Sequence, residues 1–286
     1  MHPIVGLVYF TGMLFIGMTV LHPIMLAVTL FGGISLCAGL RGARNAAKLA
    51  LGLLAIVAVS AIINPVFNHR GVTILFYGIG SNPVTLEAIV YGLVSGFMLA
   101  GTIAVFSAMC NVMTDDKVVF LFGRAVPSFA LLISMTLRFA AVMKERIMQT
   151  FSAQRCLYKS EGIYGKLRLS FAVISAVTGH IIESSLDAAG SMKARGYGLP
   201  GRTSSKLYSF TGRDAAVLCI MLFLLAEVAC GMMLGGAKAA YYPYIKLGLC
   251  DGASIAVYIG YAIFGFLPTI INFSEDIKWK RIESKI

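Results

Sequence analysis

The chain has 286 residues, of which 58% are hydrophobic and 13% are charged, and its mean hydropathy is +0.83. Soluble domains carry about 45–50% apolar and about 25% charged residues, so this apolar surplus cannot be hidden in a soluble core. The composition therefore excludes a cytosolic enzyme, a secreted disulfide scaffold and a disordered chain. The apolar residues form long continuous runs, which predicts an all-α polytopic membrane protein.

The formal net charge of +11 comes from 24 basic and 13 acidic residues. In a soluble protein, this charge would first suggest nucleic acid as a partner. In a membrane protein, basic residues mark the cytoplasmic loops instead, so we expect the lipid bilayer as a partner and no nucleic acid.

The N-terminal region, residues 1–117, contains four apolar runs long enough to span a bilayer, over residues 3–20, 23–40, 49–67 and 85–110. Residues 41–48 carry three positive charges and no acid, which places this segment and the N-terminus in the cytoplasm. Gly92 and Gly96 have the GxxxG spacing that lets helices approach closely. Such a match is also expected by chance in a chain with 30 glycines.

Residues 118–143 are apolar, but Arg124, Pro127 and Arg138 interrupt them. A charge at the bilayer centre costs about 2.5–3.5 kcal/mol on insertion scales. The overlapping segment 141–213 contains eleven basic and four acidic residues, a net charge of +7, so it belongs in the cytoplasm. We therefore expect 118–143 to lie at the inner membrane face or on the bundle, and 118–213 to form a cytoplasmic helical block.

Two more apolar runs, 214–234 and 246–272, lie in the C-terminal region 214–286, which ends in a basic tail. The prediction is thus about six transmembrane helices with both termini in the cytoplasm. Acidic residues within these runs are few: Asp214 and Asp251 lie near the starts of the last two runs, Glu87 lies near one end of its run, and Glu227 lies further inside.

The cytoplasmic block contains two amphipathic helical patterns. The first has apolar residues every four positions, at Phe139, Met143, Ile147 and Phe151. The second places one apolar face on Ile174, Val177, Ile181, Ala188 and Met192.

The second helix has a clear stop signal. Gly196 or Gly198 can take the left-handed conformation after the last turn, and Pro200 prevents continuation. Lys193 and Arg195 meet the negative end of the helix dipole, so local physics alone accounts for a cation and a glycine here. Two features also favour a binding role for this helix end. Ala194 is small, so another surface can approach closely, and the planar Arg195 guanidinium can donate to carbonyls and carboxylates of a partner.

The sequence from Ala188 to Gly198, with Arg202-Thr203 behind it, resembles the second Ala-Arg-Gly motif in the transmembrane T component of energy-coupling factor (ECF) transporters, ABC-type importers. Met135 to Phe139 and Asn64-Pro65 also resemble recurring positions of that family, and the likeness covers nearly the whole chain. In that family, two cytoplasmic coupling helices each end in an Arg-centred motif that docks into one of two ATPase subunits.

The resemblance implies which residues bind the ATPases. Arg195, flanked by Ala194 and Gly196, carries the second contact, and the first motif lies at Ala153, Gln154 and Arg155. Cys156-Leu157 depart from the fuller Ala-Arg-Gly-like ending, which leaves the docking register there open.

The resemblance also implies the partners and the location. These are two ABC ATPase subunits and a small substrate-binding membrane subunit, for uptake of a vitamin or a metal ion such as cobalt across the plasma membrane of a prokaryote. The chain itself is then not an enzyme and needs no cofactor or metal.

Two other functions stay open from the sequence. A stand-alone secondary carrier would depend on an intramembrane acid, for which Glu227 is the candidate. A membrane transferase for lipid-linked substrates would need an acidic cluster with metal-binding spacing, for which the adjacent pair Asp115-Asp116 is the candidate.

Overall fold

The computed structural model describes residues 2–68, 71–77, 83–157, 162–199, 208–248 and 252–283. These residues form nine helices and two short antiparallel hairpins, which confirms the all-α fold class. The chain divides into two compact units. We call Met1–Thr114 with Phe210–Ile286 the bundle unit, and Asp115–Ser209 the arm unit.

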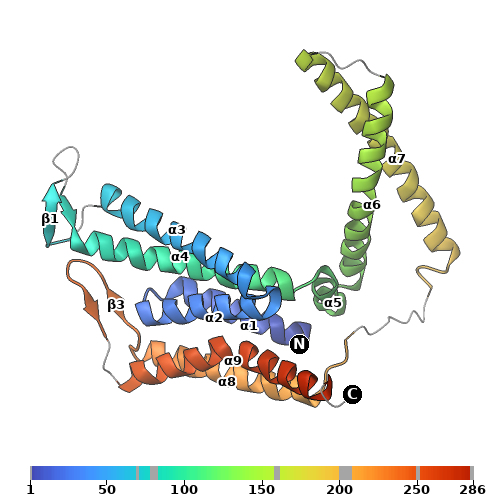
Figure 1. The fold of residues 1–286 in the computed structure, drawn as a ribbon. Coiled ribbons are helices and arrows are strands. Elements are labelled where there is room, and N and C mark those ends of the chain that lie inside the picture. The colour runs from blue at the N-terminus through green and yellow to red at the C-terminus, as the bar shows by residue number, and fades with distance from the viewer. Residues whose placement is uncertain are drawn as a thin grey trace. The chain divides into compact units, whose positions relative to one another are not determined.

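The bundle unit consists of six helices, with the arm unit inserted in the chain between the fourth and the fifth (Figure 1). Its elements are α1 (Pro3–Thr19), α2 (Pro23–Arg41), α3 (Ala43–Phe67), β1 (Ile74–Tyr77), β2 (Pro83–Thr85), α4 (Leu86–Val112), α8 (Gly212–Met233), β3 (Ala239–Ala240), β4 (Lys246–Leu247) and α9 (Gly252–Glu283).

Capping residues and prolines define where these helices begin. His2 caps α1, since its Nδ1 accepts a hydrogen bond from the Ile4 backbone N–H at 3.3 Å, and Pro3 follows at the first helical position. α8 begins with a capping box, in which Thr211 and Asp214 each accept a hydrogen bond from the other's backbone N–H.

The basic segment 41–48 is not a loop, contrary to the sequence-based expectation. α2 ends at Arg41 and α3 begins at Ala43, so only Gly42, with a φ of 84°, separates the two helices. Glycine adopts this left-handed conformation without steric cost. The alanine-rich sequence that follows has high helix propensity, so the helix starts within the basic segment.

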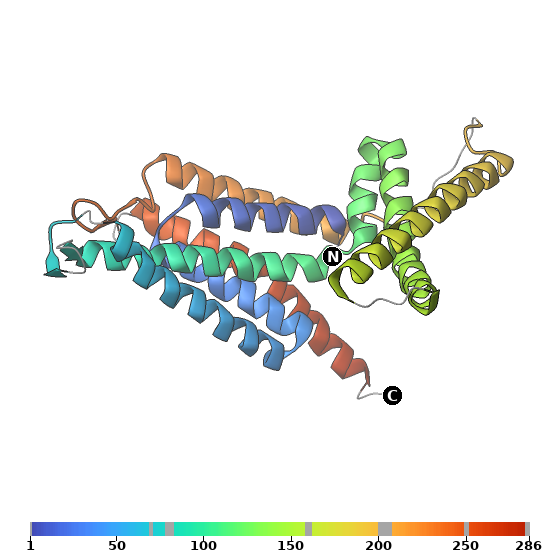
Figure 2. The same ribbon diagram turned by 90° about the horizontal axis from the view of Figure 1, so that it is seen from above.

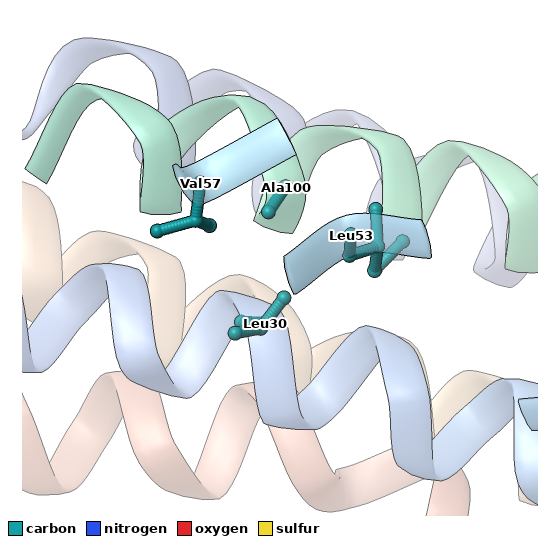
Figure 3. Close-up of a cluster of buried hydrophobic side chains, with 5 residues drawn as sticks. Leu30, Leu53, Val57 and Ala100 are labelled. Carbon is teal, nitrogen blue, oxygen red and sulfur yellow. The ribbon is translucent and has the colours of Figure 1, made fainter. Parts of the chain in front are cut away.

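One part of the bundle core lies between α2, α3 and α4. Leu30, Leu53, Val57, Ala100 and Ala104 form one buried cluster, and Figure 3 shows the first four of these side chains converging from the three helices. Burying each leucine or valine side chain of this cluster contributes about 1.5–3 kcal/mol relative to leaving it in water, and less where the alternative is lipid.

Glycines set the distance between these helices. A Cβ at Gly33 of α2 would lie 2.9 Å from the backbone N of Val105 in α4. Cβ atoms at Gly92 and Gly96 would lie 3.0 Å from the Ser60 carbonyl oxygen and 2.9 Å from the Val57 Cα. The GxxxG spacing of Gly92 and Gly96 is therefore a real helix–helix contact between α4 and α3, rather than a chance match.

Six helices are long and apolar enough to cross a membrane, by length and composition: α2, α3, α4, α7 (Gly162–Ala194), α8 and the part of α9 from Ser254. Five of them correspond to expected spans. The expected span 3–20 forms α1, which has 17 residues and lies at the lower end of the length that spans a bilayer. α7, which the sequence assigned to the cytoplasm, has the composition of a span as well.

Polar contacts join loops at one end of the bundle unit. Tyr241 donates a hydrogen bond to the Leu21 carbonyl at 2.6 Å, and burial raises the pKa of Tyr241 to about 12, so its hydroxyl stays a donor. Asn68 donates to the Tyr242 hydroxyl at 2.9 Å. His22 is fully buried, stacks on Tyr258 and shares a 2.9 Å hydrogen bond with its hydroxyl.

The arm unit contains α5 (Asp115–Ala125), α6 (Pro127–Leu157) and α7 (Figure 2). Asp115 and Asp116 lie in the first turn of α5, where carboxylates interact favourably with the helix dipole. α6 and α7 are long helices of 31 and 33 residues that cross each other.

Candidate docking site on the arm unit

A small buried cluster holds α6 and α7 together. It consists of Met143 from α6 and of Leu169, Val173 and Val177 from α7, with Phe139 and Ile181 packed against it. Met143 lies near the middle of α6, and Val173 and Val177 lie near the middle of α7. The helices are therefore fixed to each other at their crossing, and their ends extend beyond the contact (Figures 1 and 2).

The expected apolar stripes are correct only in part. Phe139, Met143, Val177 and Ile181 pack in the crossing, but Ile147 is 44% exposed and Ile174 is 61% exposed. The actual contact face of α7 begins at Leu169 and Val173, which the sequence analysis missed. The signal was available, because apolar residues recur every four positions from Leu169 to Ile181. Ile174 lies between Val173 and Val177 in the sequence, so it is exposed because it is on another face of α7 from the one that packs on α6.

The end of α7 is an ordered cap. The backbone N–H of Gly196 donates to the Lys193 carbonyl at 3.0 Å, and that of Tyr197 donates to the Met192 carbonyl at 3.0 Å. Gly196 has a φ of 83°, so the two hydrogen bonds form a Schellman motif with this glycine at its left-handed position. Gly198 also has a positive φ, at 97°, which turns the chain away from the helix axis.

Arg195 occupies the last position before this turn. Ala194 and Arg195 are exposed, and Gly196 is half-buried. The Arg195 guanidinium makes no hydrogen bond or ion pair with any residue in the described part of the chain, so its donors are available to a partner. Pro200 and Arg202-Thr203 lie outside the described residues.

The first motif lies close to the end of α6. Ala153, Gln154 and Arg155 are the fifth, fourth and third residues from the helix end at Leu157, and Arg155 is an exposed cation of the last turn. The described residues resume at Gly162, so the segment that follows the motif lies outside them.

The two motifs lie at opposite ends of the helix pair. α6 ends where α7 is about to begin, and Arg195 follows the last residue of α7 (Figure 1). Because α7 has 33 residues at about 1.5 Å each, about 50 Å of helix separates the Arg195 end from the Arg155 end. Each Arg-centred end can thus contact a different partner molecule.

Much of the arm surface between the two ends is apolar and exposed. On α6 these side chains include Leu132, Met148 and Val142, and on α7 they include Phe171, Ile174, Ile182 and Leu186, each at least 48% exposed. Large exposed apolar patches on soluble domains mark sites of contact with proteins or membranes.

The acidic residues considered for the other two functions lie outside the arm ends. Within the described residues, no group of three or more His, Cys, Asp or Glu side chains is placed to hold a metal ion. Glu227, the candidate residue for a secondary carrier, is half-buried in α8. Asp115 and Asp116, the candidate residues for a membrane transferase, lie in the first turn of α5. No protein-family model matches the chain, and no curated protein shows significant similarity to it.

Proposed function

We propose that this chain is the membrane-embedded coupling subunit, or T component, of an ECF-type ABC importer. Arg195 with Ala194 and Gly196, and Arg155 with Ala153 and Gln154, dock two ABC ATPase subunits. When ATP binding draws the ATPases together, the arm unit moves with them. That motion passes to a separate substrate-binding membrane subunit, which releases a vitamin or a metal ion into the cell.

The observation that carries the proposal is the end of α7. An ordered cap presents an exposed arginine with no partner in the described part of the chain, on a helix fixed only at its middle. Such an end suits insertion into a groove of a partner, where its five donors meet carbonyls and carboxylates. The second Arg-centred end, about 50 Å of helix away, supports a pair of docking partners rather than one.

The exposed apolar surface of the arm supports the membrane subunit as a partner. A helix pair that carries apolar side chains along its length and basic residues at its ends can contact a membrane protein and the ATPases at the same time. The same surface would be a liability in a protein that works alone.

The charge distribution supports a plasma-membrane location with both termini in the cytoplasm. In the bundle unit, the basic residues Arg41, Arg44, Lys48, Arg213, Lys278 and Lys280 lie at the α2–α3 junction, at the start of α8 and in the last turns of α9. Antiparallel packing brings these three places to one end, and the Arg213–Glu275 ion pair joins two of them. An excess of basic residues at one end marks the cytoplasmic side.

The test compares two charge reversals in the last turn of α7. Arg195→Glu is expected to reduce the ATPase that co-purifies with the tagged chain at least about tenfold, because an unpaired carboxylate enters a groove built for a cation. Lys193→Glu, an equal charge change two residues away, is the matched control and is expected to retain most of the ATPase. Equal retention in both variants would refute docking through Arg195.

A further inference from the structure

An acidic side chain lies within the apolar part of α8. Glu227 is six residues from the helix end at Met233 and fifteen from its start at Gly212. At about 1.5 Å per residue, these separations are about 9 Å and about 22 Å. If α8 spans a hydrocarbon core about 30 Å thick, the carboxylate lies inside that core rather than at either surface.

The carboxylate lies directly on a glycine of the neighbouring helix. A Cβ at Gly260 of α9 would be 2.9 Å from Oε2 and 3.0 Å from Cδ of Glu227. A Cβ at residue 260 would therefore displace the Glu227 carboxylate from its place between α8 and α9. Gly260 offers no side-chain donor, and Glu227 makes no hydrogen bond or ion pair within the described part of the chain.

The surface around Glu227 is apolar and open. Phe223, one turn earlier on α8, is 71% exposed, and Ile259 and Ile263 of α9 are 57% and 48% exposed. Glu227 itself is half-buried. Ionisable side chains within membranes are costly, and they almost always pair with another polar group.

We propose that this α8–α9 surface, defined by Phe223, Glu227, Ile259 and Ile263, binds a transmembrane helix of a different polypeptide that presents a hydrogen-bond donor to the Glu227 carboxylate. The donor is an amide, hydroxyl or cationic side chain, by complementarity to the one acceptor on the surface. Lipid tails offer no donor. A second copy of this chain, related by a two-fold axis, brings an identical acceptor to the same place. The proposal concerns a different surface from the arginine ends and does not rest on the proposed function.

The first test is site-specific photocross-linking in native membranes. A benzophenone amino acid replaces Phe223, and in the control it replaces Phe15, which is 66% exposed on α1. We expect the probe at 223 to capture a membrane polypeptide whose cross-linked peptide lies in a predicted span and contains a donor side chain. Capture of lipid alone, or of a second copy of this chain, overturns the proposal.

Substitutions at Glu227 make the test specific to the carboxylate. Glu227→Leu is expected to lower the cross-link yield at position 223 about three- to tenfold, as for the loss of one hydrogen bond within a membrane. Glu227→Gln is expected to retain most of the yield, because its amide oxygen still accepts a hydrogen bond. An unchanged yield in Glu227→Leu overturns the proposal. Arg195→Glu should leave this cross-link intact, so failure of the ATPase docking role and failure of this surface are distinguishable.

A second measurement uses the unmodified chain and avoids any folding defect of a variant. Dicyclohexylcarbodiimide is an apolar reagent that modifies carboxyl groups it can reach from within a membrane. We expect slow modification of Glu227 in native membranes, where a partner covers it, and fast modification in the chain purified alone and reconstituted in lipid. Equal rates in the two preparations, measured by mass spectrometry of the peptide that contains Glu227, overturn the proposal.

Discussion

In the bundle unit, α2 packs against α1, α3, α4 and α9, whereas in the arm unit α6 and α7 are held together by one buried cluster at their crossing. The bundle also has side-chain hydrogen bonds between its helices, such as that from the Tyr9 hydroxyl to the Gly265 carbonyl at 2.8 Å. The comparison shows two uses of apolar residues. The bundle buries a shared core and exposes the remainder to lipid, while the arm exposes most of its apolar residues along two helices that end in arginines.

The largest expected effect comes from disrupting the crossing of the arm. Val173 is 5% exposed, so Val173→Asp buries an unpaired carboxylate and is expected to destabilise the α6–α7 contact by about 3 kcal/mol or more. Limited proteolysis should then cut α6 and α7 while the bundle unit stays intact. Ile174→Asp, at a 61% exposed neighbour, is the control and should leave the arm resistant. Cleavage of both units in Val173→Asp would show that they do not fold separately.

The second prediction is that the thermal stability of the bundle falls when α2 and α4 are forced apart. Gly33→Ala places a methyl group 2.9 Å from the Val105 backbone N, and overpacking of this kind costs about 1–3 kcal/mol. The thermal midpoint in detergent should fall. Gly39→Ala, on the same helix with no atom within 4 Å of the new Cβ, should leave the midpoint unchanged or raise it. Equal midpoints in the two variants would contradict tight α2–α4 packing.

A smaller effect, on ATPase binding, is expected from a change in the cap that ends α7. Gly196→Ala forces a side chain into a φ of 83°, which costs about 1–2 kcal/mol and loosens the cap around Arg195. ATPase retention on the purified complex should weaken about five- to thirtyfold. Gly190→Ala, inside α7 with open space around its Cβ, is the control and should retain the ATPase. Weakening in both variants would mean that helix composition, rather than the cap, sets the affinity.

The smallest expected effect is a pH dependence of the bundle. Burial lowers the pKa of His22 below 6.5, and its buried Nδ1 has no hydrogen-bond partner in the described part of the chain. The unfolded chain therefore takes up a proton more readily than the folded chain. Stability then falls as pH decreases through about 6.5 and stops falling below the folded pKa. His22→Gln should remove this part of the change in thermal midpoint between about pH 7.5 and about pH 5.5, and an identical pH profile in the variant would contradict it.

Sequence patterns were sufficient for most of the fold. Composition and run length predicted the helical membrane class, and the glycine after Arg195 predicted the end of α7. These features are local, because helix propensity, hydropathy and capping act over a few neighbouring residues.

The features that the sequence did not predict depend on contacts between distant segments. Ile174 is exposed because α7 turns the face with Val173 and Val177 toward α6, and only the packing of the two helices decides which of two neighbouring apolar stripes is buried. Likewise, the role of Gly92 and Gly96 in close helix packing depends on the position of α3 against α4, which the spacing of two glycines does not specify. The ATPase docking at Arg195 and Arg155 stays a prediction that rests on resemblance and on the geometry of the helix ends.

The most direct test of the coupling role is native mass spectrometry of the tagged chain after gentle extraction from its own membranes. We expect this chain to be recovered together with two nucleotide-binding ATPase subunits and a small membrane subunit. Arg195→Glu should remove ATPase from that assembly. The coupling role would be contradicted if the chain is recovered alone under the mildest conditions, or with partners that bind no nucleotide.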